Sequence, residues 1–106
     1  MAKFYYIQCR IERGAFTNER TFEIDLSDQV RYGGEREGQL VGTAHVAHLR
    51  KGNQEAITED DPSYGEVIRG FVRCRLIRDL PAGWVMVEVP SADVIHVSKS
   101  ALVSSE

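Results

Sequence analysis

Two histidines, His45 and His48, have the residue type and spacing closest to a metal site. On a helix, side chains three residues apart are neighbours, so an H-x-x-H pair can converge on one ion. On a strand the two rings point to opposite faces and cannot share an ion. The nearest carboxylates, Glu55 and Glu59, follow a glycine turn and complete no ligand set. We therefore expect ordinary polar histidines, with no metal and no cofactor.

Cys9 and Cys74 are the candidate nucleophiles, and either would need a histidine beside it to act as one. Both alternate in phase with apolar neighbours, which predicts buried, unreactive thiols that behave as small apolar side chains. Their wide separation in sequence suggests neither a disulfide framework nor a zinc site. Because no nucleophile or acid–base set can be assembled, the sequence favours a protein that is not an enzyme.

A glycine-rich segment, residues 33–38 (GGEREG), invites comparison with a phosphate-binding loop. It lacks the Lys-Ser/Thr pair of such loops, and no helix is predicted to open after it. Glu35 and Glu37 would repel a phosphate group. The segment is therefore interpreted as an ordinary loop.

Arginines offer the most specific candidate for binding. Guanidinium groups pair with carboxylate or phosphate through two parallel hydrogen bonds. One interpretation is a patch for an anionic ligand, nucleic acid or acidic partner, and the favoured one is cross-strand pairing with Glu23, Asp25 and Glu88. Trp84, beside a Pro-Gly turn, is either an exposed contact residue or a cap on the core. The candidate contact residues are Arg10, Arg13, Arg73, Arg75, Arg78 and Trp84.

Strands are the elements that would position these side chains, because apolar residues alternate with polar ones over much of the chain. Residues 40–49 fit either a strand, which we favour, or a short helix from Thr43 that stops at Gly52. Residues 58–63 are predicted to form a mobile acidic loop, and residues 98–102 a single helical turn. About six strands are expected, in a small barrel or sandwich: residues 5–12, 21–26, 40–49, 67–78, 84–89 and 94–97.

The pattern of residues 6–13 returns in residues 71–78. When the same alignment is carried on without a gap, it places Val30 on Ile95. One interpretation is a duplicated β-β-β unit with approximate twofold symmetry, and the other is the alternation that any two hairpins share. The identical pairs are Cys9 with Cys74, Arg10 with Arg75, Arg13 with Arg78, Glu23 with Glu88, and Asp28 with Asp93.

Residues 83–103 (GWVMVEVPSADVIHVSKSALV) resemble the last two strands of SH3-like small barrels, where strand, turn and strand lead into a final helical turn. The resemblance covers about a fifth of the chain. It implies an all-β small barrel, and it implies no function, because such barrels serve many unrelated ones.

Composition sets the remaining expectations. A chain of 106 residues with 42% hydrophobic and 27% charged residues fits one globular domain, residues 1–106. The net charge of −3 disfavours a general nucleic-acid binder. No stretch has the length of a membrane span, and none resembles a signal peptide, so we expect a cytoplasmic protein. The leading prediction is a non-catalytic interaction module that acts through a sheet face or edge on a protein partner or a second copy.

Overall fold

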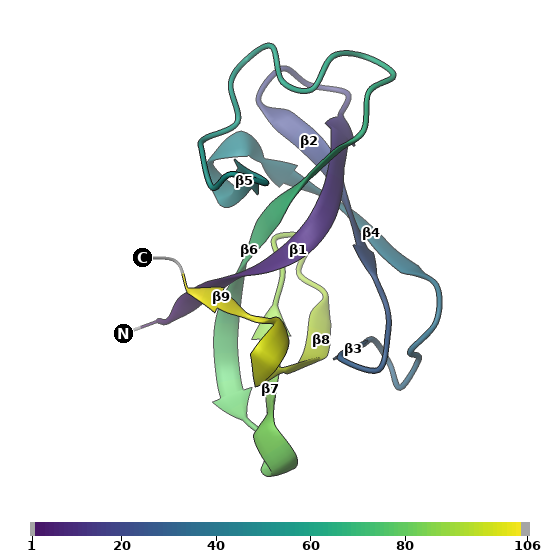
Figure 1. The fold of residues 1–106 in the computed structure, drawn as a ribbon, viewed down its shortest axis with the longest axis vertical. Coiled ribbons are helices and arrows are strands. Elements are labelled where there is room, and N and C mark those ends of the chain that lie inside the picture. The colour runs from purple at the N-terminus through teal and green to yellow at the C-terminus, as the bar shows by residue number, and fades with distance from the viewer. Residues whose placement is uncertain (1, 105–106) are drawn as a thin grey trace.

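The structure, a computed structural model, describes residues 2–104 and is all-β. A nine-stranded antiparallel sheet curls into a half-barrel (Figure 1). Three single 3₁₀ turns, η1 (Val46–His48), η2 (Pro81–Gly83) and η3 (Lys99–Ala101), are the only helical segments among the described residues. The strands are β1 (Phe4–Arg13), β2 (Glu19–Asp25), β3 (Val30–Arg31), β4 (Gln39–His45), β5 (Leu49–Lys51), β6 (Ile68–Asp79), β7 (Trp84–Glu88), β8 (Val94–Ser98) and β9 (Val103–Ser104).

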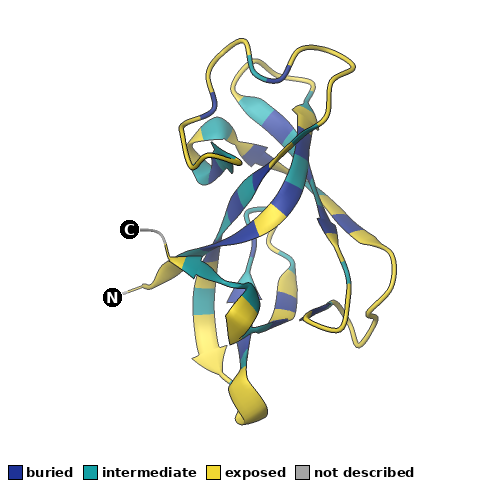
Figure 2. Ribbon diagram, in the orientation of Figure 1, coloured by how far each residue is buried: buried dark blue, intermediate teal, exposed yellow. Residues whose placement is uncertain are grey.

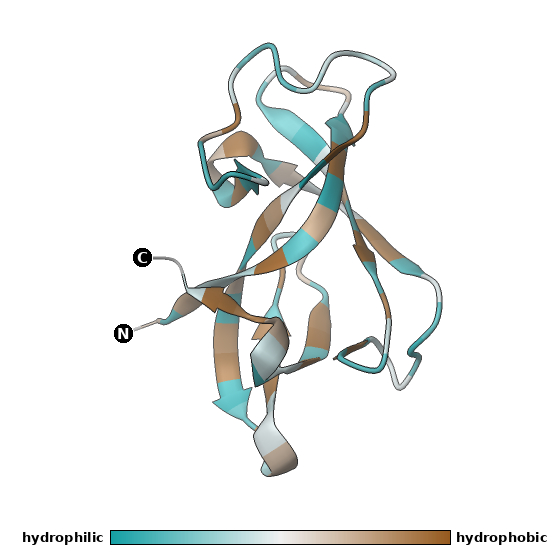
Figure 3. Ribbon diagram, viewed as in Figure 1, coloured by the Kyte–Doolittle hydropathy of each residue, from teal (hydrophilic) through white to brown (hydrophobic). Residues whose placement is uncertain are grey.

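Alternation of side chains explains why these segments form strands around one core. Ile7, Cys9 and Ile11 of β1 are buried, while Gln8 between them and Glu12 after them are exposed. The same alternation is visible along the other long strands, in burial and in hydropathy (Figures 2 and 3). The inward residues of both ends of the sheet belong to a single apolar cluster.

The all-β class is confirmed, and a strand occupies each of the six predicted segments. The segment 40–49 is a strand only as far as His45, after which η1 turns the chain into β5. The helical turn predicted for residues 98–102 is present as η3. The prediction missed β3, β5 and β9, because segments of two or three residues carry no alternating pattern.

A long ribbon of β1 and β6 runs through the middle of the sheet (Figure 1). Ile7 lies opposite Val72, and pairing continues on both sides, from Phe4 opposite Arg75 to Ile11 opposite Ile68. The strands on either side of the ribbon divide the sheet into two halves. The first half comprises β1, β2, β4, η1 and β5, and the second comprises β6, β7, β8, η3 and β9.

The two halves have matching registers. Arg10 of β1 lies opposite Glu23, as Arg75 of β6 lies opposite Glu88. Further along, Glu19 lies opposite His45 in the first half, as Trp84 lies opposite Ser98 in the second. At the end of each half, β5 pairs with β6 and β9 pairs with β1. We call two residues counterparts when these registers place them at the same position.

The registers correct the predicted alignment beyond β2. The counterpart of Ile95 is Gly42 and not Val30, because Glu23 faces Val41 as Glu88 faces Val94. Counterparts therefore follow the predicted alignment through β1 and β2, except at a β-bulge near the end of β6, and follow a shifted alignment from β4 onward. The additional residues of the first half lie between β2 and β4. They form β3, which pairs with β8 of the other half.

Gly42 also lets the two halves approach closely. A Cβ atom at this position would lie 2.7 Å from the Phe22 ring and 2.8 Å from the Ser91 side chain of the β7–β8 turn. Any larger residue would force that turn away from β4. The glycine therefore has a packing role that its counterpart, Ile95, does not need.

Candidate binding surface on the β1–β6 ribbon

The ribbon gathers three of the predicted arginines. Arg10, Arg73 and Arg75 alternate with buried residues, so they lie on its outer face. Arg73 is opposite Tyr6, and Arg75 is opposite Phe4. The other two predicted arginines, Arg13 and Arg78, lie near the ends of β1 and β6 and apart from this group.

Two of these arginines make the predicted cross-strand pairs. Arg10 reaches Glu23 at 2.6 Å and Asp25 at 2.5 Å, and Arg75 reaches Glu88 at 3.0 Å. Hydrogen bonds from Arg10 lower the pKa of Asp25 below its usual value. The same contacts raise the pKa of Arg10, so this guanidinium stays charged and occupied.

The remaining predicted residues contact rings and carbonyl groups. The guanidinium of Arg73 lies 4.5 Å from the Phe4 ring, and that of Arg31 lies 4.6 Å from the Trp84 ring. Trp84 is half-buried at the start of β7, whose buried residues are Val85 and Val87. Arg13 donates to the carbonyl oxygens of residues 59 and 62 and lies against the Tyr64 ring.

Arg78 stands apart from the other predicted arginines. It is exposed and has no hydrogen bond or ion pair with any described residue. A β-bulge shifts the register between Leu76 and Arg78, so Asp79 faces Val85 as Arg13 faces Arg20. Arg78 is consequently the counterpart of residue 12, although the sequence alignment paired it with Arg13. Sequence alone gives no sign of this bulge.

Arg20 has a structural role that was not predicted from the sequence. It is the one buried charged side chain among the described residues, with no exposed surface. Its guanidinium donates to the carbonyl oxygens of residues 17, 19, 58, 59 and 61 and contacts no carboxylate within hydrogen-bonding distance. Burial lowers the pKa of Arg20, with a smaller contribution from the charge of Arg13. The sequence did contain a sign of this burial, because Arg20 alternates in phase with the inward residues Phe22 and Ile24.

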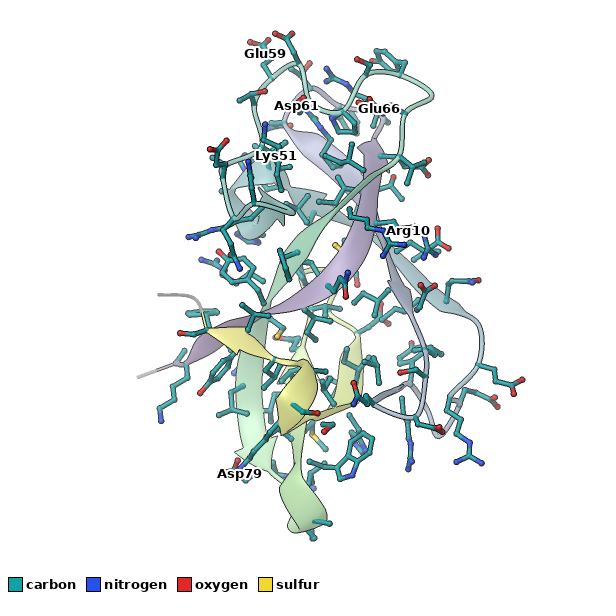
Figure 4. All side chains as sticks on the ribbon, in the orientation of Figure 1. Arg10, Lys51, Glu59, Asp61, Glu66 and Asp79 are labelled. Carbon is teal, nitrogen blue, oxygen red and sulfur yellow. The ribbon has the colours of Figure 1, made fainter. Side chains whose placement is uncertain are left out.

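These bonds tie down the acidic loop that the sequence predicted to be mobile. The connection between β5 and β6 arches over the end of the first half (Figure 1). Two residues of this connection, Ile57 and Pro62, are buried. Lys51 reaches the Asp61 carboxylate at 2.8 Å, and both side chains lie at this end of the molecule (Figure 4). Residues 57–62, which we call the plug, therefore cover the end of the first half.

The corresponding end of the second half is hollow. A cavity of about 470 Å³ lies there beside Tyr5, Leu76 and Val85. Val85 is the counterpart of Arg20, so this end lacks the guanidinium that holds the plug in the first half.

Two clefts flank the ribbon at counterpart positions. Cleft A has a volume of about 420 Å³ and includes Gln8, Arg10 and Arg69. Cleft B has a volume of about 150 Å³. Every residue that lines cleft B has its counterpart in the lining of cleft A. The lining of cleft B consists of Phe4, His48, Arg73, Cys74, Arg75, Glu88, Val89 and Pro90.

One histidine lies near a cysteine, since His48 and Cys74 both line cleft B, but both thiols of the chain are buried. Burial raises the pKa of both thiols, of Cys9 and of Cys74, to about 12. The rings of His45 and His48 have their centroids 6.4 Å apart, and Nδ1 of His45 accepts a hydrogen bond from the amide of Ala47. Burial also lowers the pKa of His48. Within residues 2–104, no three His, Cys, Asp or Glu side chains are grouped so as to hold a metal ion.

No family model, curated protein or solved structure matches this chain. In the described part of the chain, no helix has the length and apolar character needed to cross a membrane. The functional proposal therefore rests on the chain's own geometry.

Proposed function

We propose that this protein is a non-catalytic interaction module that pairs with a second copy of itself through the outer edge of β4. The observation that carries the proposal is a difference between counterpart strands. β8 has β7 on one side and β3 on the other, with Val30 opposite Val97 and Arg31 opposite His96. β4 has β2 on one side and no described strand on the other. One half thus uses an added strand at an edge that the other half leaves open.

The composition of β4 supports pairing at this edge. Exposed edge strands usually carry charged residues or proline, which prevent pairing with other chains. The seven residues of β4 (QLVGTAH) include no Asp, Glu, Lys, Arg or Pro. Val41 is 57% exposed on this strand. Two such edges can pair antiparallel around a twofold axis, which is self-complementary and brings no like charges together.

The surroundings of the thiols support a non-catalytic role. A thiolate is the nucleophilic form of cysteine, and burial of Cys9 and Cys74 suppresses it. His48 lines cleft B together with Cys74, but burial raises the pKa of that thiol to about 12, so it stays protonated at neutral pH.

We also propose that the chain is a duplication of a unit resembling an SH3-like small barrel. The matching registers support this proposal, as does the order strand, strand, strand, 3₁₀ turn and short strand in both halves. The duplicated unit would extend past the predicted β-β-β unit to include η1 and β5, or η3 and β9.

The mass of the untagged protein in solution tests the pairing of β4. We expect twice the chain mass of 11.9 kDa at micromolar concentration. Val41→Lys should shift the protein to monomer, because it puts a positive charge from each copy on the paired edge. The matched control is Val94→Lys, which alters the counterpart in β8 and should leave the dimer intact. A wild-type monomer, or a Val41→Lys dimer, would refute the proposal.

Arg69 favours a second candidate function, the binding of an anionic ligand or nucleic acid on the outer face of the ribbon. It is exposed opposite Arg10 and makes no hydrogen bond or ion pair with the described residues. Binding through phosphate contacts would weaken steeply as salt rises. A binding constant for a single-stranded oligonucleotide that does not change with salt would exclude this function.

A further inference from the structure

We infer that cleft A is a binding site for an uncharged nucleobase. In cleft B the guanidinium of Arg73 lies 4.5 Å from the centroid of the Phe4 ring, and both side chains line the cleft. The counterpart of Arg73 is Gln8, and the counterpart of Phe4 is Arg69. Cleft A therefore has the guanidinium of Arg69 where cleft B has the Phe4 ring. It has the shorter side chain of Gln8 where cleft B has the longer one of Arg73.

The guanidinium of Arg69, which makes no side-chain hydrogen bond or ion pair with a described residue and whose charge helps to lower the pKa of Asp25, defines one wall of the site. Arg69 and Phe71 are two residues apart on β6 and both line cleft A. Side chains at this spacing on a strand stand about 7 Å apart. A flat ring between them would be about 3.5 Å from each, which is the separation of atoms in contact. It would stack on Phe71 and restore for Arg69 the cation–ring contact that Arg73 makes with Phe4.

The rim of cleft A selects the chemistry of the ring. Gln8 and Gln29 line the cleft, and their side-chain amides make no hydrogen bond with any residue from 2 to 104. A carboxamide pairs with a donor and an acceptor that lie side by side, as on the edge of adenine. The charges of Glu23 and Asp25 in the lining balance those of Arg10 and Arg69, so the cleft has no net positive charge to attract an anion. These groups together favour a base, and they disfavour a carboxylate or phosphate placed inside the cleft.

The volume is consistent with such a ligand. Cleft A, at about 420 Å³, lies within the usual range of small-molecule sites. Cleft B, at about 150 Å³, lies below it. The same arrangement of strands thus leaves a small cleft in the second half and a larger one in the first.

Titration of adenosine into ¹⁵N-labelled protein tests the site. We expect saturable shifts at the amides of Gln8, Arg69 and Phe71, unchanged between low and high salt because the ligand is uncharged. The double variant Gln8→Arg/Arg69→Phe transplants the contents of cleft B and should weaken binding at least tenfold. Arg69→Ala tests the same wall without adding bulk. Arg73→Gln, on the same face but outside cleft A, is the matched control and should bind as the wild type does.

Two further titrations distinguish a nucleic acid from a free nucleoside and test whether binding depends on the dimer. An oligoadenylate that binds more tightly than adenosine, with added salt dependence, would identify single-stranded nucleic acid as the source. Equal affinity would identify a free nucleoside. The Val41→Lys variant should bind adenosine normally, because cleft A does not include β4. The inference is overturned if adenosine produces no saturable shifts at millimolar concentration, or if Gln8→Arg/Arg69→Phe binds as tightly as the wild type.

Discussion

Arg20 is a charged side chain that is held inside the protein without a charged partner. A buried charge is tolerated when hydrogen bonds replace its water, and here five backbone carbonyl groups accept them. Three of these carbonyl groups belong to the plug. The guanidinium therefore joins β2 to a loop that is distant in the sequence.

Arg20→Met should lower the free energy of unfolding by about 2–4 kcal/mol, because several buried carbonyl groups lose their donor. Urea unfolding followed by circular dichroism measures the change. Arg36→Met is the control, since Arg36 is exposed and its contact with Asp28 is long, at 3.6 Å. That substitution should change stability by less than about 0.5 kcal/mol. Equal effects of the two substitutions would contradict the role assigned to Arg20.

The buried thiols lead to a second prediction at this scale. A pKa near 12 instead of 9.0 reduces the thiolate fraction at neutral pH about a thousandfold. Cys9 and Cys74 should therefore react very slowly with a disulfide reagent in the native protein, and both should react at once in urea. Rapid modification of either thiol in the native state would show that the site is open to solvent.

At the scale of the elements, the stabilisation that the plug provides should decrease as the pH falls. Hydrogen bonds from Lys51 and Thr58 lower the pKa of Asp61 below its ordinary value of 3.8. Because the carboxyl group is more acidic in the folded chain, the unfolded chain binds more protons as the pH falls. The stabilising contribution of the Asp61 carboxylate is therefore present above about pH 4 and is lost as the pH falls below that value.

Asp61→Asn should therefore make the free energy of unfolding fall less steeply between about pH 4 and pH 3 than in the wild type. Urea titrations at several pH values measure this slope. Asp60→Asn is the matched control, because Asp60 is exposed and forms no ion pair with a described residue. A wild-type slope in Asp61→Asn would show that the plug contributes nothing to acid stability.

The elements also show how far sequence reasoning reaches. Alternation located the longer strands, because a strand with one buried face must carry inward residues at every second position. It could not locate β3, β5 or β9, which are held by their partners and not by their own pattern. The alignment of Cys9 with Cys74 matched β1 and β2 to β6 and β7 correctly up to the β-bulge of β6, where Asp79, and not Arg78, takes the position of Arg13. It failed after β2, because an inserted segment shifts the alignment without leaving a compositional sign.

The candidate surface was predictable only in part. Arg10, Arg73 and Arg75 were recognised from their spacing, and the structure brings them to one face. Arg69 was not predicted, since the role that we propose for it depends on its position opposite Arg10 and on the difference between Arg69 and its counterpart, Phe4. Such a difference becomes visible only when two clefts can be compared position by position.

For the whole molecule, the two halves are joined in a way that makes neither complete alone. β5 of the first half pairs with β6, and β9 of the second half pairs with β1. The buried residues of both halves form one cluster. We expect a single cooperative unfolding transition.

The single tryptophan, Trp84, lies in the second half and reports on it by fluorescence. Arg20→Met, in the first half, should shift the fluorescence and circular dichroism transitions by the same amount. Val87→Ala, at a fully buried position of the second half, should do so as well, with a loss of about 2 kcal/mol. Separate transitions in the two signals would mean that the halves are independent domains.

Hydrogen exchange of the β4 amides tests the central claim, pairing through the open edge, most directly. The outward amides of β4 should be protected at high protein concentration and should exchange rapidly on dilution, when the dimer dissociates. The amides of β8 that face β3 should keep one rate throughout, because their partner strand belongs to the same chain. Fast exchange of the outward β4 amides at every concentration would contradict the account, because it would mean that this edge stays open in solution.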